Sequence, residues 1–211
     1  MSLPTASLHG LYVLTDAALL PDGKLFSGVE AAIRGGARLV QYRDKSSDTA
    51  RREREARALL ALCHAHDVPL IINDDVNLAQ IVGADGVHLG RDDAALEQAR
   101  MQLGPHALIG MSCYDSLPRA IDAVRAGADY VAFGSFFASP SKPGAVRAPP
   151  ELLHEAHKHL GIPVCAIGGI TSGNGATLLS AGADMLAVIN AVFATTDIEQ
   201  AAGDLARLFD R

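Results

Sequence analysis

The chain has 211 residues, of which 49% are hydrophobic, and its mean hydropathy is +0.17, so it can bury a substantial core. Its net charge of −6 argues against a general surface for nucleic acid or for an anionic membrane. We therefore expect small molecules as partners, with any anion-binding site confined to a local cluster of cations.

The compartment is indicated by the cysteines and by the N-terminus. Cys63, Cys113 and Cys165 are odd in number and lie in or beside apolar runs, which favours reduced, buried thiols. The first ten residues show no charged region followed by an apolar one, and no uninterrupted apolar run reaches the roughly 18 residues of a membrane helix. We expect a cytoplasmic protein without a membrane partner.

Eight short apolar runs follow one another along the chain, and each predicts a buried strand. Four of them repeat one phrase, in which a glycine and an alanine precede the apolar residues. The runs are GLYVLTD from Gly10, GARLVQY from Gly36, VPLIIND from Val68, GADGVHL from Gly83, ALIGMSC from Ala107, GADYVAF from Gly127, IPVCAIGG from Ile162 and GADMLAV from Gly182.

The segments between these runs predict helices. Residues 52–66, 117–127 and 150–161 place apolar side chains at spacings of three and four. Eight strands that alternate with helices are typical of a TIM (β/α)8 barrel, an α/β fold that we expect to form a single domain over residues 1–211. A doubly wound open sheet is the alternative, but no G-x-G-x-x-G motif follows the first run.

In such a barrel the active site lies at the carboxyl ends of the strands, so the residues that end each run are candidates. The second run ends in Gln41, Arg43 and Lys45 at alternate positions, and alternate side chains of a strand share a face. We expect these three side chains to converge on one small volume, where they would bind an anion. A strand end whose charges are merely solvated is the alternative.

Acidic residues follow the third and fourth runs. Asp74 and either Asp92 or Asp93 could hold Mg²⁺, which prefers oxygen ligands and usually shares phosphate oxygens of a substrate. Each of these residues also stands where it could cap a following helix. Taken singly, capping and metal binding are equally good interpretations.

Two later segments suit a phosphate. Gly168 and Gly169 end the seventh run, and this fold often binds phosphate after its seventh and eighth strands. The irregular stretch 134–150 carries two hydroxyls and a lysine in the phrase SPSK. The alternatives are a glycine turn and an ordinary polar loop.

With these residues in view, the chain resembles a known family. The phrases LYVLTD, QYRDK, IINDD, DGVHLG, IGMS, ADYVAFGSFF, SPSK and AIGGI resemble, in order and spacing, the thiamine-phosphate synthase family over almost the whole chain. The resemblance implies a TIM-barrel transferase of thiamine biosynthesis, in which a pyrimidine diphosphate and a thiazole phosphate give thiamine phosphate and pyrophosphate with the help of Mg²⁺.

The resemblance also implies roles for individual residues. Those expected to bind the pyrimidine diphosphate are Gln41, Arg43, Lys45, Asn73, Ser112 and Lys142. Of these, the residues expected to act in catalysis are Arg43, Lys45, Lys142 and Ser112. Asp74 and Asp93 are expected to hold Mg²⁺. The thiazole phosphate is expected to contact Ser139, Ser141, Gly169, Ile189 and Asn190.

The chain departs from the family pattern at several positions. Arg91 stands where the family usually has Gln, Ser135 where it has Pro, SPSK where it has Thr-x-Thr-Lys, and Asn190 where it often has Ser. Ser and Asn keep a hydrogen-bond donor, so phosphate binding should survive, whereas Arg91 beside Asp93 puts the second metal ligand in question.

Two alternative functions stay open at this point. A thiazole tautomerase shares the barrel, but we expect a catalytic histidine after its sixth strand, and GSFFASPSK contains none. A phosphate-binding regulatory barrel without catalysis is the second alternative. The sequence does not decide the oligomeric state, and a homo-oligomer is compatible with it.

Overall fold

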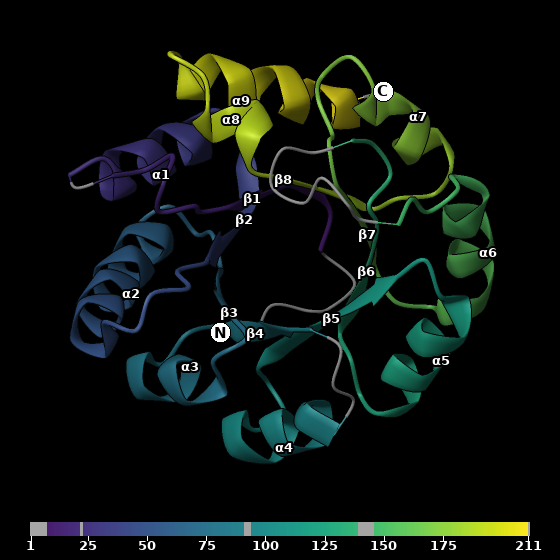
Figure 1. Cartoon of the computed structure of the whole chain (residues 1–211), viewed down its shortest axis with the longest axis horizontal. Helices are drawn as coiled ribbons and strands as arrows, with labels where there is room; N and C mark the ends of the chain where they lie inside the picture. The colour runs from purple at the N-terminus through teal and green to yellow at the C-terminus, as the bar shows by residue number, and fades with distance from the viewer. Residues whose placement is uncertain (1–7, 22, 91–93, 139–145, 211) are drawn as a thin grey trace.

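A computed structural model describes residues 8–21, 23–90, 94–138 and 146–210. Eight parallel strands hydrogen-bond in the order β1 to β8, and β1 closes on β8. The helices form a ring around this barrel (Figure 1). The predicted TIM-barrel fold is confirmed, and the doubly wound open sheet is wrong because both edge strands pair with each other.

Each of the eight apolar runs contains a strand. The strands are β1 (Gly10–Leu14), β2 (Ala37–Tyr42), β3 (Leu70–Asn73), β4 (Gly86–Leu89), β5 (Leu108–Tyr114), β6 (Tyr130–Phe133), β7 (Val164–Ile167) and β8 (Met185–Val188). Their residues are almost all buried, because one face packs on the helices and the other fills the barrel lumen.

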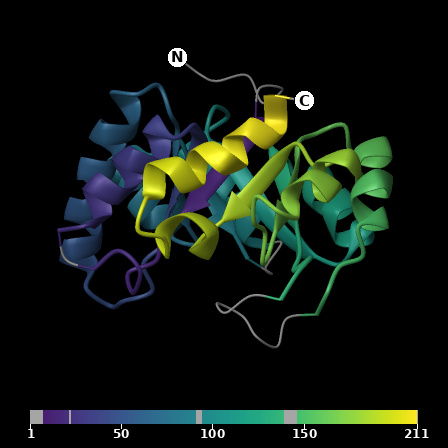
Figure 2. The same cartoon turned by 90° about the horizontal axis from the view of Figure 1, so that it is seen from above.

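The helices occupy the segments between the strands. They are α1 (Leu25–Arg34), α2 (Thr49–His64), α3 (Val76–Val82), α4 (Ala94–Leu103), α5 (Leu117–Arg125), α6 (Glu151–Leu160), α7 (Gly175–Ser180), α8 (Asn190–Phe193) and α9 (Ile198–Ala206), followed by a 3₁₀ turn, Arg207–Asp210. Figures 1 and 2 show α9, in yellow, lying beside α1, so the last helix closes the ring against the first.

Local sequence explains where several helices begin. Asp48, Asp75, Ser116 and Asp197 each accept a hydrogen bond from the backbone N–H three residues later, as N-cap residues do. Polar residues suited to turns thus separate strand from helix, and the apolar faces of the helices turn toward the barrel.

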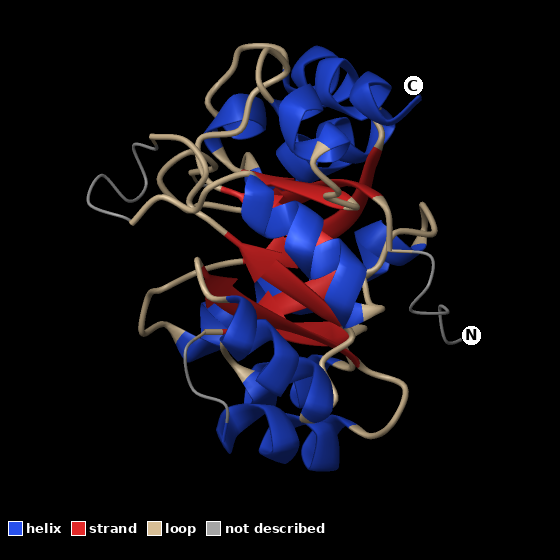
Figure 3. Ribbon diagram, turned by 90° about the vertical axis from the view of Figure 1, so that its right-hand side faces the viewer, coloured by secondary structure: helices blue, strands red, loops and turns tan. Residues whose placement is uncertain are grey.

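The core has two layers. One lies between the strands and the helices, and the other fills the lumen with side chains such as Tyr12, Leu39, Ile71, Tyr130 and Met185. Figure 3 shows the strands, in red, enclosed between helices. Because all strands run in the same direction, their carboxyl ends meet at one end of the barrel, which we call the carboxyl rim.

Candidate active site

Gln41, Arg43 and Lys45 do not share one environment. Strand β2 ends at Tyr42, so its alternation of side chains does not extend to Arg43 and Lys45. Gln41 points into the lumen and is 1% exposed, Arg43 lines a small pocket beside Asp16, and Lys45 lines a much larger pocket. The alternation of a strand therefore does not account for the predicted convergence of these three side chains on one small volume, which stays a prediction.

The end of β1 holds Arg43 in place. The Arg43 guanidinium lies 3.2 Å from the Asp16 carboxylate, and the Arg43 backbone N–H donates to the Thr15 hydroxyl at 2.8 Å. Thr15 is buried, and its own N–H donates to the Gln41 carbonyl. Arg43 thus reaches the carboxyl rim with its backbone and its side chain both anchored.

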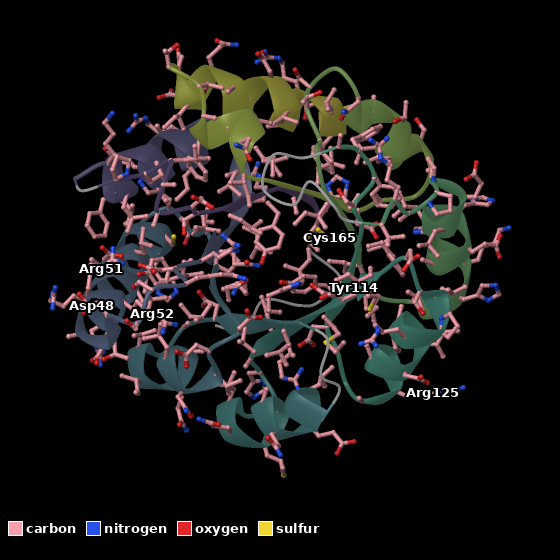
Figure 4. All side chains as sticks on the ribbon, viewed as in Figure 1. Asp48, Arg51, Arg52, Tyr114, Arg125 and Cys165 are labelled. Carbon is pink, nitrogen blue, oxygen red and sulfur yellow. The ribbon has the colours of Figure 1, made fainter. Side chains whose placement is uncertain are left out.

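A second set of charges holds the loop after β2. Arg51 donates to Asp44 at 2.6 Å and to Ser46 at 2.9 Å, and it also approaches Glu55. Figure 4 shows Arg51 on α2 close to Arg52. The Asp44 side chain is only 3% exposed and that of Arg51 is 30% exposed, so this ion pair is partly shielded from water and orders the loop that carries Lys45.

This environment shifts the pKa values of Asp44 and Tyr42. Burial favours a higher pKa for Asp44, but hydrogen bonds from Ser46 and the nearby Arg51 and Arg52 charges outweigh burial and lower it. Burial and a 2.6 Å hydrogen bond to Glu55 raise the pKa of Tyr42. Asp44 therefore stays ionised and Tyr42 stays protonated at neutral pH.

A large pocket on this side of the carboxyl rim has a volume of about 710 Å³. It lies over the ends of β2 and β3 and the adjoining face of α4. Its lining is mostly polar and comprises Asp44, Lys45, Ser46, Arg52, Asn73, Asp74, Asp75, Val76, Asn77, Gln98, Ala99 and Gln102. The pocket brings together three of the predicted site residues, namely Lys45, Asn73 and Asp74.

Asp74 and Asp75 have different tasks. Asp75 is the N-cap of α3, where it accepts from the Leu78 N–H at 2.9 Å, and it also pairs with Arg52. Asp74 has a φ of 60° and accepts a hydrogen bond from the Asn73 amide at 2.8 Å. The capping interpretation of Asp74 is therefore wrong, and its carboxylate faces the large pocket instead of a helix end.

The Asp74 carboxylate also lies near the start of the loop after β4. A Cβ atom at Gly90 would stand 3.7 Å from Asp74 Oδ1. Arg91, Asp92 and Asp93 follow Gly90 and lie outside the described residues. Among the residues that the structure does describe, no three His, Cys, Asp or Glu side chains gather as a metal-binding group.

Hydrogen bonds link five polar side chains across the lumen, and we call this set the lumen chain. Gln41 Nε2 donates to the Tyr12 hydroxyl at 2.6 Å, and the hydroxyls of Tyr12 and Tyr130 are 3.0 Å apart. His88 Nδ1 lies 3.0 Å from the Tyr130 hydroxyl, and His88 Nε2 lies 2.9 Å from Ser112 Oγ. Ser112 is half-buried, so the lumen chain ends at an accessible position.

The carboxyl rim differs in character after β6 and β7. A Cβ atom at Gly168 would stand 2.0 Å from Ser135 Oγ, and one at Gly169 would stand 2.3 Å from the Ala138 carbonyl oxygen. Both glycines have positive φ, at 105° and 63°. Close packing of the two loops thus requires glycine at both positions.

The N–H of Gly169 is a candidate donor for a ligand. No backbone–backbone hydrogen bond among the described residues uses it. Ile189 and Asn190 follow β8, the next strand, and Asn190 begins the short helix α8. Because β7 pairs with β8, Gly169, Ile189 and Asn190 follow neighbouring strand ends, and their role toward the thiazole phosphate stays a prediction.

Four of the predicted site residues lie outside the described residues. They are Asp93, Ser139, Ser141 and Lys142. Their roles stay predictions.

Sequence reasoning did not identify the contacts that support the site. Asp16 and Thr15 hold Arg43, Arg51 holds Asp44, and Tyr12 and Tyr130 connect the lumen chain. Tyr12 and Tyr130 are separated by 118 positions and fit an apolar strand pattern, so the sequence carries no signal that their hydroxyls meet.

The cysteines and helices bear on the expected compartment. All three cysteines are buried and form no disulfide, and burial raises the pKa of the Cys63 thiol to about 12. In the part of the chain that the structure describes, no helix combines the length and apolar character needed to cross a bilayer.

Comparison with known proteins identifies close relatives. A sequence model of the family described as thiamine monophosphate synthase matches residues 11–192. The chain is 55% identical over 201 residues to the thiamine-phosphate synthase of Thiobacillus denitrificans, covering 95% of this chain and 94% of that protein. It is 54% identical to the corresponding protein of Thioalkalivibrio sulfidiphilus, covering 96% of each.

A solved structure agrees with these relatives. The thiamine phosphate pyrophosphorylase from Pyrococcus furiosus superimposes with a TM-score of 0.86 at 35% identity, and the match covers 95% of both chains. Sequence and structure thus point to the same family.

Proposed function

Because the chain belongs to the thiamine monophosphate synthase family, we propose that it joins two phosphorylated precursors of thiamine. The substrates are 4-amino-2-methyl-5-(diphosphooxymethyl)pyrimidine and 4-methyl-5-(2-phosphooxyethyl)thiazole, and the products are thiamine phosphate and pyrophosphate. The observation that carries this proposal is the large polar pocket, which is lined by Lys45, Asn73 and Asp74. Asp75 caps α3, so the Asp74 carboxylate is not used as a helix cap.

Gln41 is proposed to bind the pyrimidine. Its Oε1 atom is buried and has no hydrogen-bond partner among the described residues. A buried acceptor without a partner is costly, so a ligand that supplies a donor is favoured there. The amino group of the pyrimidine is such a donor.

The diphosphate is proposed to lie along the carboxyl rim after β2, β3 and β5. Arg43 and Lys45 supply positive charge, while Asn73 and Ser112 supply uncharged donors. Lys142 is assigned to the same group by resemblance alone. These groups neutralise charge that grows on the departing oxygens, which is how preorganised donors accelerate such a step.

The residues present fit a Mg²⁺ ion. Mg²⁺ usually takes one or two carboxylates and completes its shell with water and substrate phosphate oxygens, so it needs no group of three acidic side chains. Asp74 is supported as one ligand because its carboxylate does not cap a helix and lies beside Asn73 and Gly90. Asp93 is proposed as the other. When bound, the ion supplies positive charge to the diphosphate.

The reaction is then a dissociative displacement. The bond between the pyrimidine methylene carbon and the diphosphate oxygen breaks, and both electrons leave with pyrophosphate. The electron-rich aminopyrimidine ring delocalises the positive charge left on carbon, so no strong base is required. The thiazole nitrogen donates its lone pair to that carbon and forms the new carbon–nitrogen bond, and the chain contributes by holding both partners in line.

The thiazole phosphate is proposed to lie at the ends of β7 and β8. The N–H of Gly169 is supported as a donor by its lack of a backbone partner among the described residues. Asn190 and Ile189 stand beside it on the next strand end. Ser139 and Ser141 are proposed to complete this subsite.

One assay tests the proposal. The purified chain is mixed with both precursors and Mg²⁺, and thiamine phosphate and pyrophosphate are measured, with controls that omit each component. We expect both products only when all components are present. Thiazole isomerisation alone would identify a tautomerase, and tight thiazole phosphate binding without product would identify a regulatory barrel.

The location and partners follow from the same proposal. We propose a cytoplasmic protein with small-molecule substrates, supported by the three buried thiols. A homo-oligomer remains compatible with this proposal.

A further inference from the structure

The lumen chain has a direction, because one of its ends can act only as a donor. An amide nitrogen donates and does not accept, so Gln41 Nε2 gives a hydrogen to the Tyr12 oxygen. The Tyr12 hydroxyl then has its own hydrogen left to give. The Tyr130 oxygen, 3.0 Å away, is the acceptor within reach.

The same reasoning continues to Ser112. Tyr130 accepts from Tyr12, so its hydrogen goes to His88 Nδ1. A neutral imidazole whose Nδ1 accepts must carry its hydrogen on Nε2. That hydrogen is donated to Ser112 Oγ at 2.9 Å, and the hydrogen of Ser112 is left for an acceptor outside the lumen chain.

Counting the hydrogens of the five side chains in the lumen chain favours a neutral His88. Burial raises the pKa of Tyr12 and of Tyr130, so both hydroxyls keep their hydrogens at neutral pH. A doubly protonated His88 would donate from Nδ1 to Tyr130, and one tyrosine hydrogen would then have no acceptor within the lumen chain. The neutral ring satisfies every link, in a lumen where His88 is only 8% exposed.

The fold makes room for this arrangement at Gly110. Strands β5 and β6 pair Gly110 with Tyr130, and a Cβ atom at Gly110 would stand 2.0 Å from Tyr130 Cζ. A side chain at this position would displace the Tyr130 ring. The Tyr130 hydroxyl therefore reaches both Tyr12 and His88 because β5 carries no side chain there.

We propose that Tyr12, Tyr130 and His88 are positioning residues that turn the Ser112 hydroxyl into a hydrogen-bond donor toward the substrate. This inference rests on the proposed function, in which Ser112 faces the leaving pyrophosphate. Phosphate oxygens only accept hydrogen bonds, so a serine that is fixed as a donor suits them better than one that rotates freely.

The direction can be measured without turnover. The full chain is labelled with ¹⁵N, and long-range proton–nitrogen NMR correlations report which imidazole nitrogen of His88 is protonated. The signals are assigned by their loss in His88→Gln. We expect the tautomer with hydrogen on Nε2 in the ligand-free protein.

Gln41→Glu tests whether direction is transmitted along the lumen chain. At a pH that ionises the introduced carboxyl, as followed by its ¹³C signal, that group can only accept from Tyr12. Each link then reverses, and we expect the hydrogen of His88 to move to Nδ1. In Gln41→Glu combined with Tyr12→Phe, the hydroxyl link is absent and the hydrogen should remain on Nε2.

Several outcomes would overturn the proposal. They are hydrogen on Nδ1 in the wild-type protein, an unchanged tautomer in Gln41→Glu with a folded chain, and the same reversal in the absence of the Tyr12 hydroxyl. Protonation of both nitrogens would show attraction through space instead of transmission, and would also count against it. None of these outcomes depends on whether thiamine phosphate is formed.

A kinetic measurement links the direction to Ser112. Tyr130→Phe removes one hydrogen bond that positions His88, so the single-turnover rate at saturating substrates should fall about tenfold. His88→Gln keeps a donor near Ser112 and should retain more of this rate than His88→Ala. Equal rates for the two His88 variants would contradict a positioning role.

Discussion

The two sides of the carboxyl rim differ in the groups that they offer to a ligand. After β1, β2 and β3, charged side chains dominate. Arg43 pairs with Asp16, Asp74 accepts a hydrogen bond from Asn73, and the Arg51–Asp44 pair holds the loop that carries Lys45. After β6 and β7, glycines at Gly168 and Gly169 let backbone segments pack closely. The side proposed to face the leaving pyrophosphate is built from charged side chains, whereas the side proposed to hold the thiazole phosphate offers backbone groups.

This comparison predicts which kinetic step slows when each side of the carboxyl rim is mutated. Loss of a charged side chain should mainly slow the chemical step, because its interaction strengthens as the leaving group departs. Loss of backbone geometry should mainly weaken binding of the thiazole phosphate. The following variants test that division.

Asp74→Asn should have the largest effect. Removal of a metal ligand costs several kcal/mol of transition-state stabilisation, so turnover should fall on the order of a thousandfold at limiting Mg²⁺. The free energy of unfolding should hardly change, because Asp75 caps α3 and Asn tolerates the positive φ of this position.

Asp75→Asn is the matched control for that variant. Asn caps a helix about as well as Asp, so this change removes only the ion pair with Arg52. We expect much smaller losses of turnover. Activity of Asp74→Asn within a few-fold of the wild type would exclude a metal-binding role for Asp74.

Lys142→Ala should have the next largest effect. Loss of one group that stabilises developing charge typically costs about 2.7 to 4 kcal/mol, on the order of a hundred- to a thousandfold in turnover. Single-turnover kinetics at saturating substrates would measure it. An unchanged chemical rate with a raised KM would identify Lys142 as a simple binding contact.

Gly169→Ala tests the backbone side. The new Cβ would stand 2.3 Å from the Ala138 carbonyl oxygen at a φ of 63°, so the loops must separate. A displacement of this kind costs up to roughly a hundredfold in kcat/KM, and we expect most of it as a raised KM for the thiazole phosphate.

Gly83→Ala controls for the strain of positive φ. Gly83 also has a positive φ, at 71°, but a Cβ there would meet no atom within 4 Å. This variant should lose about 1 to 2 kcal/mol of unfolding free energy and keep its activity. Similar kinetics for both glycine variants would show that the close packing of Gly169 is unimportant.

Asp44→Asn should have the smallest effect, and it depends on pH. The pKa of Asp44 is lowered in the folded chain from an ordinary value of 3.8, so its charge stabilises the fold above that pH. This stabilisation is lost as pH falls through the folded pKa. The variant should be about 1 kcal/mol less stable than the wild type at neutral pH.

The measurement is urea unfolding of both proteins at several pH values. The difference in unfolding free energy should shrink as pH falls below about 3.8, because the wild-type carboxyl then also loses its charge. A difference that grows toward acid pH would show that Asp44 is not held as a carboxylate by Arg51.

Much of the fold could be predicted from local patterns. The repeat that begins at Gly36, Gly83, Gly127 and Gly182, together with four further apolar runs, predicted every strand. Apolar periodicity has a physical cause, since each strand is buried on both faces and each helix on one. Eight strands that alternate with helices then predict a closed parallel barrel.

The site was predicted less completely, because the periodicity of side chains applies only within a strand or a helix, and the site residues lie at the ends of strands. The alternation of side chains predicted that Gln41, Arg43 and Lys45 share a face, but β2 ends at Tyr42, so the rule covers only Gln41. The sequence offered Asp74 as the possible cap of α3, whereas Asp75 caps it in the structure. One residue of difference separates a helix cap from a side chain that faces the pocket.

The sequence by itself determined the order of strands and helices, the family, and the rim positions that bear cations, acids and glycines, because these depend on neighbours along the chain. Only the tertiary structure decided that Tyr12 and Tyr130 meet, that Asp16 holds Arg43, and that Gly110 makes room for Tyr130. Barrel closure brings distant strands together at the spacing of a hydrogen bond, and hydrogen-bond direction depends on that contact in space.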